Sequence, residues 1–295
     1  MRHHQRCGVR TVPDSRPSVA VGKTGRNPGR SGFNHEAVGV DKGYIGIENN
    51  KPDAIALLTE KAKAYPHIEV VPLQVKYPQG GEKQLIAAVT GREVPAPPAL
   101  PINVGAVVQN VGTVFSIYEA VMKNKPLFER VITVTGKEVQ NPSNLLARIG
   151  TPMNQLIEEC GGLPENTGKV IGGGPMMGKA LMNLDVPVCK GSSGLLLMSE
   201  RESRRAEPQP ASVAPNVSVP ARWGSSPIVG HASALRNWEL AEDNDITSCI
   251  ECGSCQFTCP STRPMLDNIR MGKTTVMALI RLVIQNKRER LWQRN

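Results

Sequence analysis

The alternation of apolar and polar residues in the first part of the chain predicts a strand–helix–strand unit. An apolar run that begins at Gly43 has the residue types of a strand and ends at the polar residues 48–50. Residues 51–65 carry most of their alanine, isoleucine and leucine side chains at helical spacing, and Pro52 suits a first helical turn. Residues 67–75 alternate again. Strands joined through a helix run parallel, so the pattern predicts a βαβ unit.

The pattern continues with a short helix over 84–90, a strand over 104–110 and a helix over 114–122. Beyond residue 125 the order changes to two strands, a helix and further short strands. These runs lie at 128–135, 144–150, 153–161 (the helix), 169–171, 186–188 and 195–198. The β-β-α order resembles a β-grasp module.

Two stretches lack any period. Residues 1–43 are rich in Arg, Gly, Pro and Ser, a composition that buries too little apolar surface to order a chain. Residues 203–235 contain mostly Pro, Ser, Ala and Val, which is typical of a linker. A helical pattern restarts at Trp238, and the segment 269–284 predicts an amphipathic helix before a basic tail, 286–295. We expect that helix to pack on its own domain, with membrane attachment as the alternative.

Composition and charge narrow the class of protein. The chain has 295 residues and a net charge of +9, with the excess mainly at the two ends. A zinc-dependent nucleic-acid protein is disfavoured, because interleaved aromatic residues, a basic recognition helix and a second Cys pair are absent. No run of 18 apolar residues predicts a membrane span, and the N-terminus lacks the apolar core of a signal peptide.

The strongest chemical signal is the run Cys249-Ile-Glu-Cys-Gly-Ser-Cys-Gln-Phe-Thr-Cys-Pro. Its spacing, Cys-x-x-Cys-x-x-Cys-x-x-x-Cys-Pro, is that of bacterial ferredoxins, whose thiolates ligate 4Fe–4S clusters. The candidate ligands are Cys249, Cys252, Cys255 and Cys259. A structural zinc ion is the alternative, but zinc ribbons pair Cys-x-x-Cys with a second, distant pair. Clustered metal-binding cysteines indicate a reducing compartment.

Three other sites each allow two interpretations. Gly80 and Gly81 precede a predicted helix and either admit an anion to its N-terminus or form an ordinary turn. Asn110 stands where a strand becomes a helix, as a ligand-binding residue or a helix cap. The glycine run 172–178 either holds phosphate or permits tight backbone packing, and we favour packing.

Five motifs together resemble the C subunit of the Rnf (Rsx) complex, the ion-translocating ferredoxin:NAD oxidoreductase. They are Ile45-Gly-Ile-Glu-Asn-Asn-Lys-Pro-Asp-Ala-Ile, Tyr77-Pro-Gln-Gly-Gly-Glu-Lys-Gln-Leu-Ile, Gln109-Asn-Val-Gly-Thr, Gly172-Gly-Gly-Pro-Met-Met-Gly and Asp245-Ile-Thr-Ser-Cys-Ile-Glu-Cys-Gly-Ser-Cys. The resemblance covers about 45–205 and 236–285. The family is similar to the flavin-carrying subunit of respiratory complex I.

The resemblance implies a translocase subunit that carries FMN, exchanges hydride with NAD(H) and passes electrons through two 4Fe–4S clusters. It implies a peripheral position on the cytoplasmic face of the bacterial inner membrane. The implied partners are the other membrane and peripheral subunits and ferredoxin or a redox subunit. Nucleic acid is not expected to be a partner. The residues that match the family's flavin site are Tyr77, Gly80, Gly81, Glu82 and Asn110.

The chain also departs from the family. A glycine-rich G-x-G-G-A-G-F-P loop, a C-E-P-Y-I-T segment and a first cysteine run are missing. In such two-cluster domains, the fourth cysteine of each run ligates the other cluster. The DNA that encodes residues 210–224, when it is read in a frame shifted by two bases, is compatible with the motif Cys-x-x-Cys-x-x-Cys-x-x-x-Cys-Pro. We therefore hypothesise that about 210–235 is out-of-frame translation, and that about 5–43 is a similar artefact; natural disorder is the alternative.

The predicted fold class is α/β in three parts: a βαβ-containing flavin/NADH-binding-like domain, a β-grasp domain and a partial α-helical ferredoxin-like domain. The boundaries follow the changes in pattern. They are 1–43 (disordered or out of frame), 44–125 (partial flavin domain), 126–202 (β-grasp), 203–235 (linker or out of frame), 236–285 (iron–sulfur half) and 286–295 (basic tail). The predicted function is electron transfer within the complex, impaired in this copy. The alternative is a docking module without complete cofactor sites.

Overall fold

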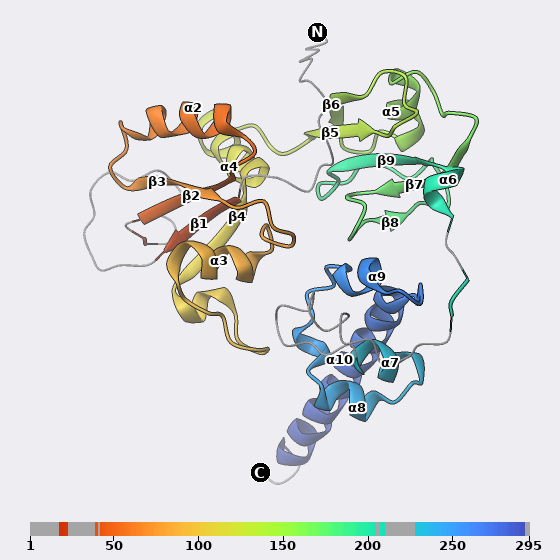
Figure 1. Cartoon of the computed structure of the whole chain (residues 1–295). Coiled ribbons are helices and arrows are strands. Elements are labelled where there is room, and N and C mark those ends of the chain that lie inside the picture. The colour runs from red at the N-terminus through yellow and green to blue at the C-terminus, as the bar shows by residue number, and fades with distance from the viewer. Residues whose placement is uncertain (1–17, 23–38, 41, 205–206, 210–227, 293–295) are drawn as a thin grey trace. The chain divides into compact units, whose positions relative to one another are not determined.

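The computed structural model describes residues 18–22, 39–40, 42–204, 207–209 and 228–292, without the side chains of 18–22, 287–288 and 290–292. The chain divides into two compact units, Met1–Ser203 and Arg204–Asn295 (Figure 1). The first unit contains two sheets, and the second is helical in its described residues.

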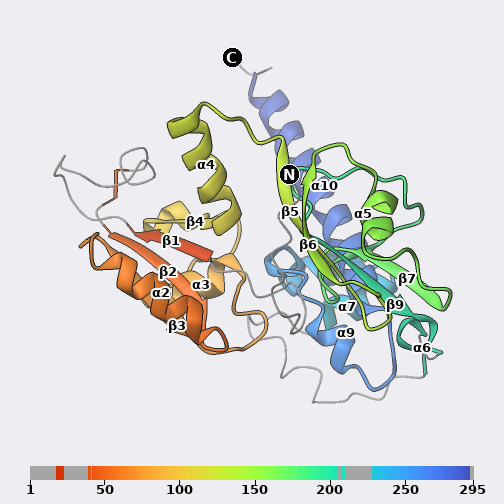
Figure 2. The same cartoon turned by 90° about the horizontal axis from the view of Figure 1, so that it is seen from above.

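The first sheet has four strands in the order β3-β2-β1-β4, with helices on its faces. Figures 1 and 2 show α2 and α3 on opposite faces. The elements are β1 (Ser18–Gly22), β2 (Lys42–Glu48), α2 (Pro52–Ala62), β3 (Ile68–Leu73), α3 (Glu82–Thr90), the 3-10 turn η1 (Pro101–Val104), β4 (Ala106–Asn110) and α4 (Val111–Lys123).

The predicted βαβ unit is confirmed, since β2 and β3 pair in parallel on either side of α2 in the sequence. Leu85 and Ile86 of α3 are fully buried: Leu85 packs with Leu73 of β3, and Ile86 packs with Ala106 of β4. These two side chains pack with the apolar side chains that alternate along the strands, and together they form the core of this sheet.

Strand β1 corrects the prediction that residues 1–43 contain no regular structure. Residues Ser18–Gly22 pair antiparallel with both neighbours, so that Ser18 lies opposite Gly46 of β2 and Asn110 of β4. The segment reads Ser-Val-Ala-Val-Gly, too short for a recognisable period. Because β1 lies between two strands, both of its backbone edges are hydrogen-bonded. The sequence pattern did not indicate this pairing. Residues 1–17, 23–38 and 41 lie outside the described residues.

The second sheet is mixed and follows the predicted β-grasp order. Its strands lie in the order β6-β5-β9-β7-β8, with β5 parallel to β9 and the other pairs antiparallel. Its elements are β5 (Glu129–Thr135), β6 (Ser143–Arg148), α5 (Met153–Glu159), β7 (Thr167–Gly172), β8 (Lys179–Ala180), β9 (Gly194–Ser199) and the short helix α6 (Glu200–Ser203). Ile132 and Leu195 of the sheet pack with Leu156 and Ile157 of α5. The predicted strand at 186–188 is only an isolated bridge between Pro152 and Pro187.

The glycine run 172–178 permits close packing, the role that the sequence favoured. A Cβ atom at Gly178 would collide with the carbonyl oxygen of Gly174 and the side chain of Ile171. Gly173 has a φ of 108°, which side chains disfavour. The backbone therefore folds onto itself where any larger residue would not fit.

The second unit is built around one long helix. Its elements are α7 (Ile228–Ala234), α8 (Trp238–Asp243), the 3-10 turn η3 (Ile246–Ser248), α9 (Ser254–Thr258) and α10 (Met265–Trp292). Val229, Ala241, Ile246, Ile269 and Val276 form its buried core. Helix α10 begins before the predicted residue 269, and it includes residues 286–292, which the sequence pattern assigned to the basic tail.

Helix α7 corrects the prediction that 203–235 is entirely a linker. Val229, Ala232 and Ser233 are buried at helical spacing against the rest of the unit. Small residues allow two helices to approach closely, and the same Ala- and Ser-rich composition resembled a linker in the sequence. Most of the segment in the frame-shift hypothesis, residues 210–227, lies outside the described residues.

Among the helices that the structure describes, none is both long and apolar enough to cross a lipid bilayer.

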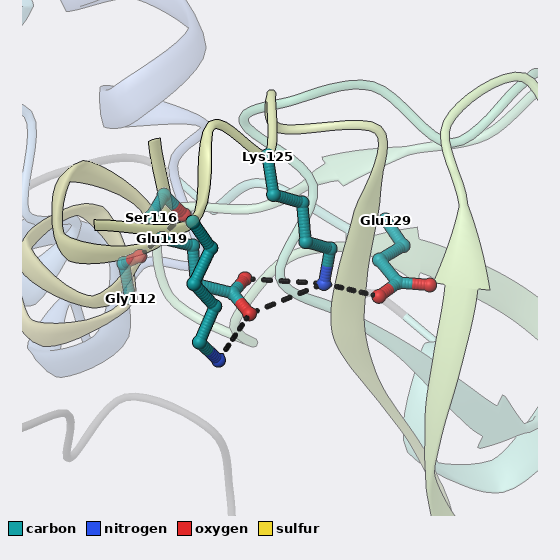
Figure 3. A network of polar contacts seen from close by, with 6 residues as sticks. Gly112, Ser116, Glu119, Lys125 and Glu129 are labelled. Atoms are coloured by element: carbon teal, nitrogen blue, oxygen red, sulfur yellow. Dashed lines mark hydrogen bonds and ion pairs between the residues drawn. The ribbon is translucent and has the colours of Figure 1, made fainter. Parts of the chain in front are cut away.

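A network of charges joins the end of α4 to β5 (Figure 3). Lys125 Nζ lies 3.2 Å from Glu119 Oε1 and 2.7 Å from Glu129 Oε1, and Lys123 Nζ lies 3.4 Å from Glu119. Hydrogen bonds from Glu129 and Glu119 raise the pKa of Lys125. Burial by itself would raise the pKa of Glu119, but the two lysines outweigh it and lower that pKa below 4.5.

We expect Lys125→Met to lower the stability of the first unit most strongly at neutral pH. The contribution of Glu119, whose pKa is lowered, is present above pH 4.5 and is lost as pH falls through the folded value. The contribution of Lys125, whose pKa is raised, is present below pH 10.5 and is lost at higher pH. Urea unfolding followed by tyrosine absorbance measures this unit, because all four tyrosines lie in it.

Lys179→Met is the control, because Lys179 is exposed on β8 of the same unit. Equal effects of the two substitutions at every pH would contradict a specific role for the Glu119–Lys125–Glu129 network.

Candidate functional site

The carboxyl ends of three strands meet at one edge of the first sheet. Strands β2 and β3 are parallel, and β1 is antiparallel to both β2 and β4, so β2, β3 and β4 point the same way. The loop that contains Tyr77–Glu82 follows β3, and Asn110 ends β4. The topology thus brings all five predicted flavin-site residues to one edge, the side on which open α/β sheets bind ligands.

The loop before α3 requires glycine at its last position. Gly81 is the N-cap of α3 and offers no side chain to the first N–H groups of the helix. A Cβ atom at Gly81 would lie 3.0 Å from Gln84 Cδ and 3.2 Å from the carbonyl oxygen of Pro78. Tyr77 and Glu82 are exposed beside it. This arrangement can present backbone N–H groups and an aromatic ring to an anionic, planar ligand.

Asn110 caps helix α4, which was one of its two predicted roles. Its Oδ1 accepts a hydrogen bond from the backbone N–H of Gly112 at 2.9 Å. The cap uses the amide oxygen and neither N–H donor of the side chain, so capping and ligand binding are chemically compatible.

Glu48 at the end of β2 is a candidate that the sequence analysis did not single out. It lies at the same edge and forms an ion pair with Lys51, at 3.3 Å between Nζ and Oε2. In dinucleotide-binding folds, an acidic residue at the carboxyl end of a strand accepts ribose hydroxyls. The signal was its position at the polar end of the first predicted strand.

The cysteine run begins in a loop between η3 and α9 that curls through left-handed backbone, and it continues through α9, which contains Cys255 and ends before Cys259. Glu251 has a φ of 57° and Gly253 a φ of 79°. The backbone N–H of Glu251 points to Cys249 Sγ at 3.4 Å, and the thiol of Cys252 lies 3.4 Å from Ser254 Oγ. Cys249 and Cys255 pack against the buried core of this unit.

Three of the four thiols influence one another. Burial raises the pKa of Cys255 to about 11, and the charges of Cys249 and Cys252 add to this effect. Burial also raises the pKa of Cys249, with Cys252 again contributing. Charge effects of this kind require Cys249, Cys252 and Cys255 to lie near one another.

The donor set suits an iron–sulfur cluster at Cys249, Cys252 and Cys255. Thiolates are the ligands of such clusters, and an N–H directed at sulfur is one of the ways a protein tunes them. Within the described residues, no three His, Cys, Asp or Glu side chains are arranged to hold one metal ion. A cluster spreads its thiolates over several irons, so its ligands need not converge on one point as those of a single ion do.

The remaining cysteines lie elsewhere. Cys160 is buried in the β-grasp core, where burial raises its pKa, and Cys189 is exposed in the same unit. Cys7 lies outside the described residues.

Comparison with known protein families identifies the domain family to which each sheet of the first unit belongs. Residues 33–119 match the Nuo51 FMN-binding domain, and residues 131–180 match the SLBB domain. The first match begins ten residues before Gly43, where the sequence pattern became recognisable. The α/β fold with a complex I-like flavin domain and a β-grasp domain is thereby confirmed.

Curated relatives share the sequence over most of this chain. The C subunit of the Na(+)-translocating ferredoxin:NAD(+) oxidoreductase complex of Acetobacterium woodii is 42% identical over 82% of this chain and 55% of its own length. The C subunit of the proton-translocating complex of Clostridium ljungdahlii is 42% identical over 75% and 40%. The C subunit of the ion-translocating oxidoreductase complex of Rhodobacter capsulatus is 40% identical over 61% and 34%.

The chain thus spans about half the length of the first of these relatives and less of the others. The two domain matches and the shared identity agree with the resemblance carried by the five motifs. This chain therefore belongs to the family of C subunits of the ion-translocating oxidoreductase complexes.

Proposed function

We propose that this chain transfers electrons between NAD(H), a flavin and iron–sulfur clusters as part of the C subunit of an ion-translocating ferredoxin:NAD oxidoreductase. One observation supports this best: a flavin-type sheet edge and a loop of three interacting thiols occur in one chain. We further propose that the protein is peripheral on the cytoplasmic face of the inner membrane, bound to other subunits of the complex.

At the sheet edge, the residues proposed to bind FMN are Tyr77, Gly80, Gly81, Glu82 and Asn110. The flavin, when bound, supplies hydride and single-electron chemistry. The protein's contribution is orientation: Gly81 keeps the backbone accessible, and the N-terminus of α3 favours negative charge. Because the glycine-rich loop of the family is missing, we expect purified protein to retain flavin weakly or not at all.

Substitutions at Asn110 separate capping from ligand binding. Asn110→Ser keeps a capping oxygen, so we expect the stability of the first unit to change by less than about 0.5 kcal/mol. Asn110→Ala removes the hydrogen bond to Gly112 and should cost about 1 kcal/mol. Both variants lose the amide donors, so both should bind FMN with a higher dissociation constant. A fluorescence titration that extends to saturating flavin measures this constant. If Asn110→Ser bound FMN as well as the original chain, Asn110 would be only a helix cap.

In the second unit, Cys249, Cys252 and Cys255 are proposed to hold one 4Fe–4S cluster, and Cys259 to serve a second. The cluster supplies one-electron transfer, and the surrounding helices exclude water and fix the thiols. The fourth ligand of the first cluster comes from the cysteine run that we propose is encoded in another frame under 210–224. Sequencing the gene tests this: DNA that cannot encode those cysteines in another frame would refute the frame shift.

Anaerobic reconstitution with iron and sulfide tests the proposed function. We expect broad absorption near about 400 nm and about four irons per chain. Retained zinc without visible absorption, together with no flavin binding, would instead favour a docking module that lacks complete cofactor sites.

A further inference from the structure

Helix α10 contacts the cysteine loop through side chains and backbone on one of its faces. The backbone N–H of Leu266 donates to Gln256 Oε1 at 3.0 Å, and Arg270 and Lys273 contact Glu251. These three positions on α10 are spaced by four and three residues, so they lie along one side of the helix.

Lys273 makes two contacts with the loop. Its Nζ donates to the backbone carbonyl of Cys249 at 2.6 Å and lies 3.3 Å from Glu251 Oε1. Arg270 Nε lies 3.4 Å from Glu251 Oε2. The side chains of Arg270, Lys273 and Glu251 are 27%, 21% and 31% exposed, so water screens these charges only in part.

Glu251 connects these cations to the cysteines. It is a non-glycine residue in left-handed backbone, with a φ of 57°, a conformation that needs support from its surroundings. In this conformation its backbone N–H points to Cys249 Sγ. The ion pairs with α10 supply the support, because they fix the side chain on the helix.

We propose that Arg270, Lys273 and Glu251 form a positioning and charge-tuning unit for the cluster-binding loop. The three side chains hold Cys249 and Cys252 in place, and their net charge of +1 stabilises the reduced form of a cluster bound there. This inference rests on the proposed function, since it assumes that the cluster binds at these cysteines. Nothing in the spacing of the cysteines indicates this role, because two of its three residues lie on another helix.

The direction in which each substitution shifts the reduction potential of the cluster follows from the net charge that remains. Glu251→Gln leaves two cations and favours reduction, whereas Lys273→Met leaves no net charge and favours the oxidised form. We expect about a tenfold change in the ratio of reduced to oxidised cluster at fixed potential, which equals about 59 mV for a one-electron couple. Lys273→Arg keeps the charge and should restore the original value to within about twofold.

The first experiment is a redox titration of the reconstituted full chain by electron paramagnetic resonance. Arg281→Met is the matched control: it removes one cation from the same helix at an exposed position. Eight residues separate it from Lys273, which is about 12 Å along a helix and beyond the screening length of about 8 Å at physiological salt. If Lys273→Met and Arg281→Met moved the potential equally, or if Glu251→Gln lowered it, the charge-tuning proposal would be wrong.

The second experiment uses the metal-free chain, so it does not depend on cluster assembly. We expect Lys273→Met and Glu251→Gln to speed hydrogen exchange at the backbone amide of residue 251 about tenfold, and Arg281→Met to leave that rate unchanged. An unchanged rate in Lys273→Met would refute the positioning role. If no variant, including the original chain, takes up iron while this rate responds as expected, the cluster assignment fails and the positioning role stands.

Discussion

Replacing Cys255 by serine is expected to reduce the iron bound on anaerobic reconstitution by at least about tenfold, whereas replacing Cys259 leaves most of it. Loss of a group that only supports a metal ligand already costs about 10–100-fold in affinity, so loss of a ligand costs at least as much. Cys255 lies near Cys249 and Cys252, whose charges contribute to its raised pKa. In two-cluster domains the last cysteine of a run ligates the other cluster, and this is the role proposed for Cys259.

Iron content and visible absorption of the two variants, prepared in parallel, measure this difference. Cys189→Ser is the control, because that thiol is exposed in the first unit and should not affect iron binding. Equal loss of iron in Cys255→Ser and Cys259→Ser would contradict the separation of three ligands from the fourth.

Gly272→Ala is expected to destabilise the second unit by about 2 kcal/mol. A Cβ atom at this position would collide with Ser233 Oγ, and it would lie 2.8 Å from Ser233 Cβ and 2.9 Å from Ile246 Cδ1. Both residues are fully buried, so neither can move aside easily. Overpacking costs about 3 kcal/mol, and the better helix propensity of alanine recovers about 1 kcal/mol.

Tryptophan fluorescence during urea unfolding measures this unit selectively, since all three tryptophans lie in it. Ser233→Gly combined with Gly272→Ala relieves the collision and should recover part of the loss. Thr274→Ala is the control, because Thr274 is exposed on the same helix. An unchanged unfolding midpoint in Gly272→Ala would show that α7 and α10 do not pack as the structure describes.

Much of the local structure could be predicted from the sequence because it depends on local periodicity. The βαβ unit, the strand that ends at Asn110 and the β-grasp order follow from apolar spacing over a few residues. The spacing of the cysteine run likewise restricts its chemistry, since the residues that bind one cofactor are close in sequence.

The errors occur where burial depends on distant partners. Strand β1 is too short for a period and exists in the structure through its pairing with β2 and β4. Helix α7 has the composition of a linker, and only its contact with α10 explains why Val229 and Ser233 are buried. In both cases the deciding free energy comes from tertiary contacts, which composition does not encode.

By itself, the sequence determined the residue types of both candidate sites, the parallel βαβ unit and the membership of the family that five motifs indicated. Only the tertiary structure decided two further points. It brought the ends of β2, β3 and β4 to one edge, and it placed Arg270 and Lys273 beside the loop of Glu251. The physical reason is the same for each: direction, burial and charge pairing are properties of residues brought together by folding, and no local pattern records them.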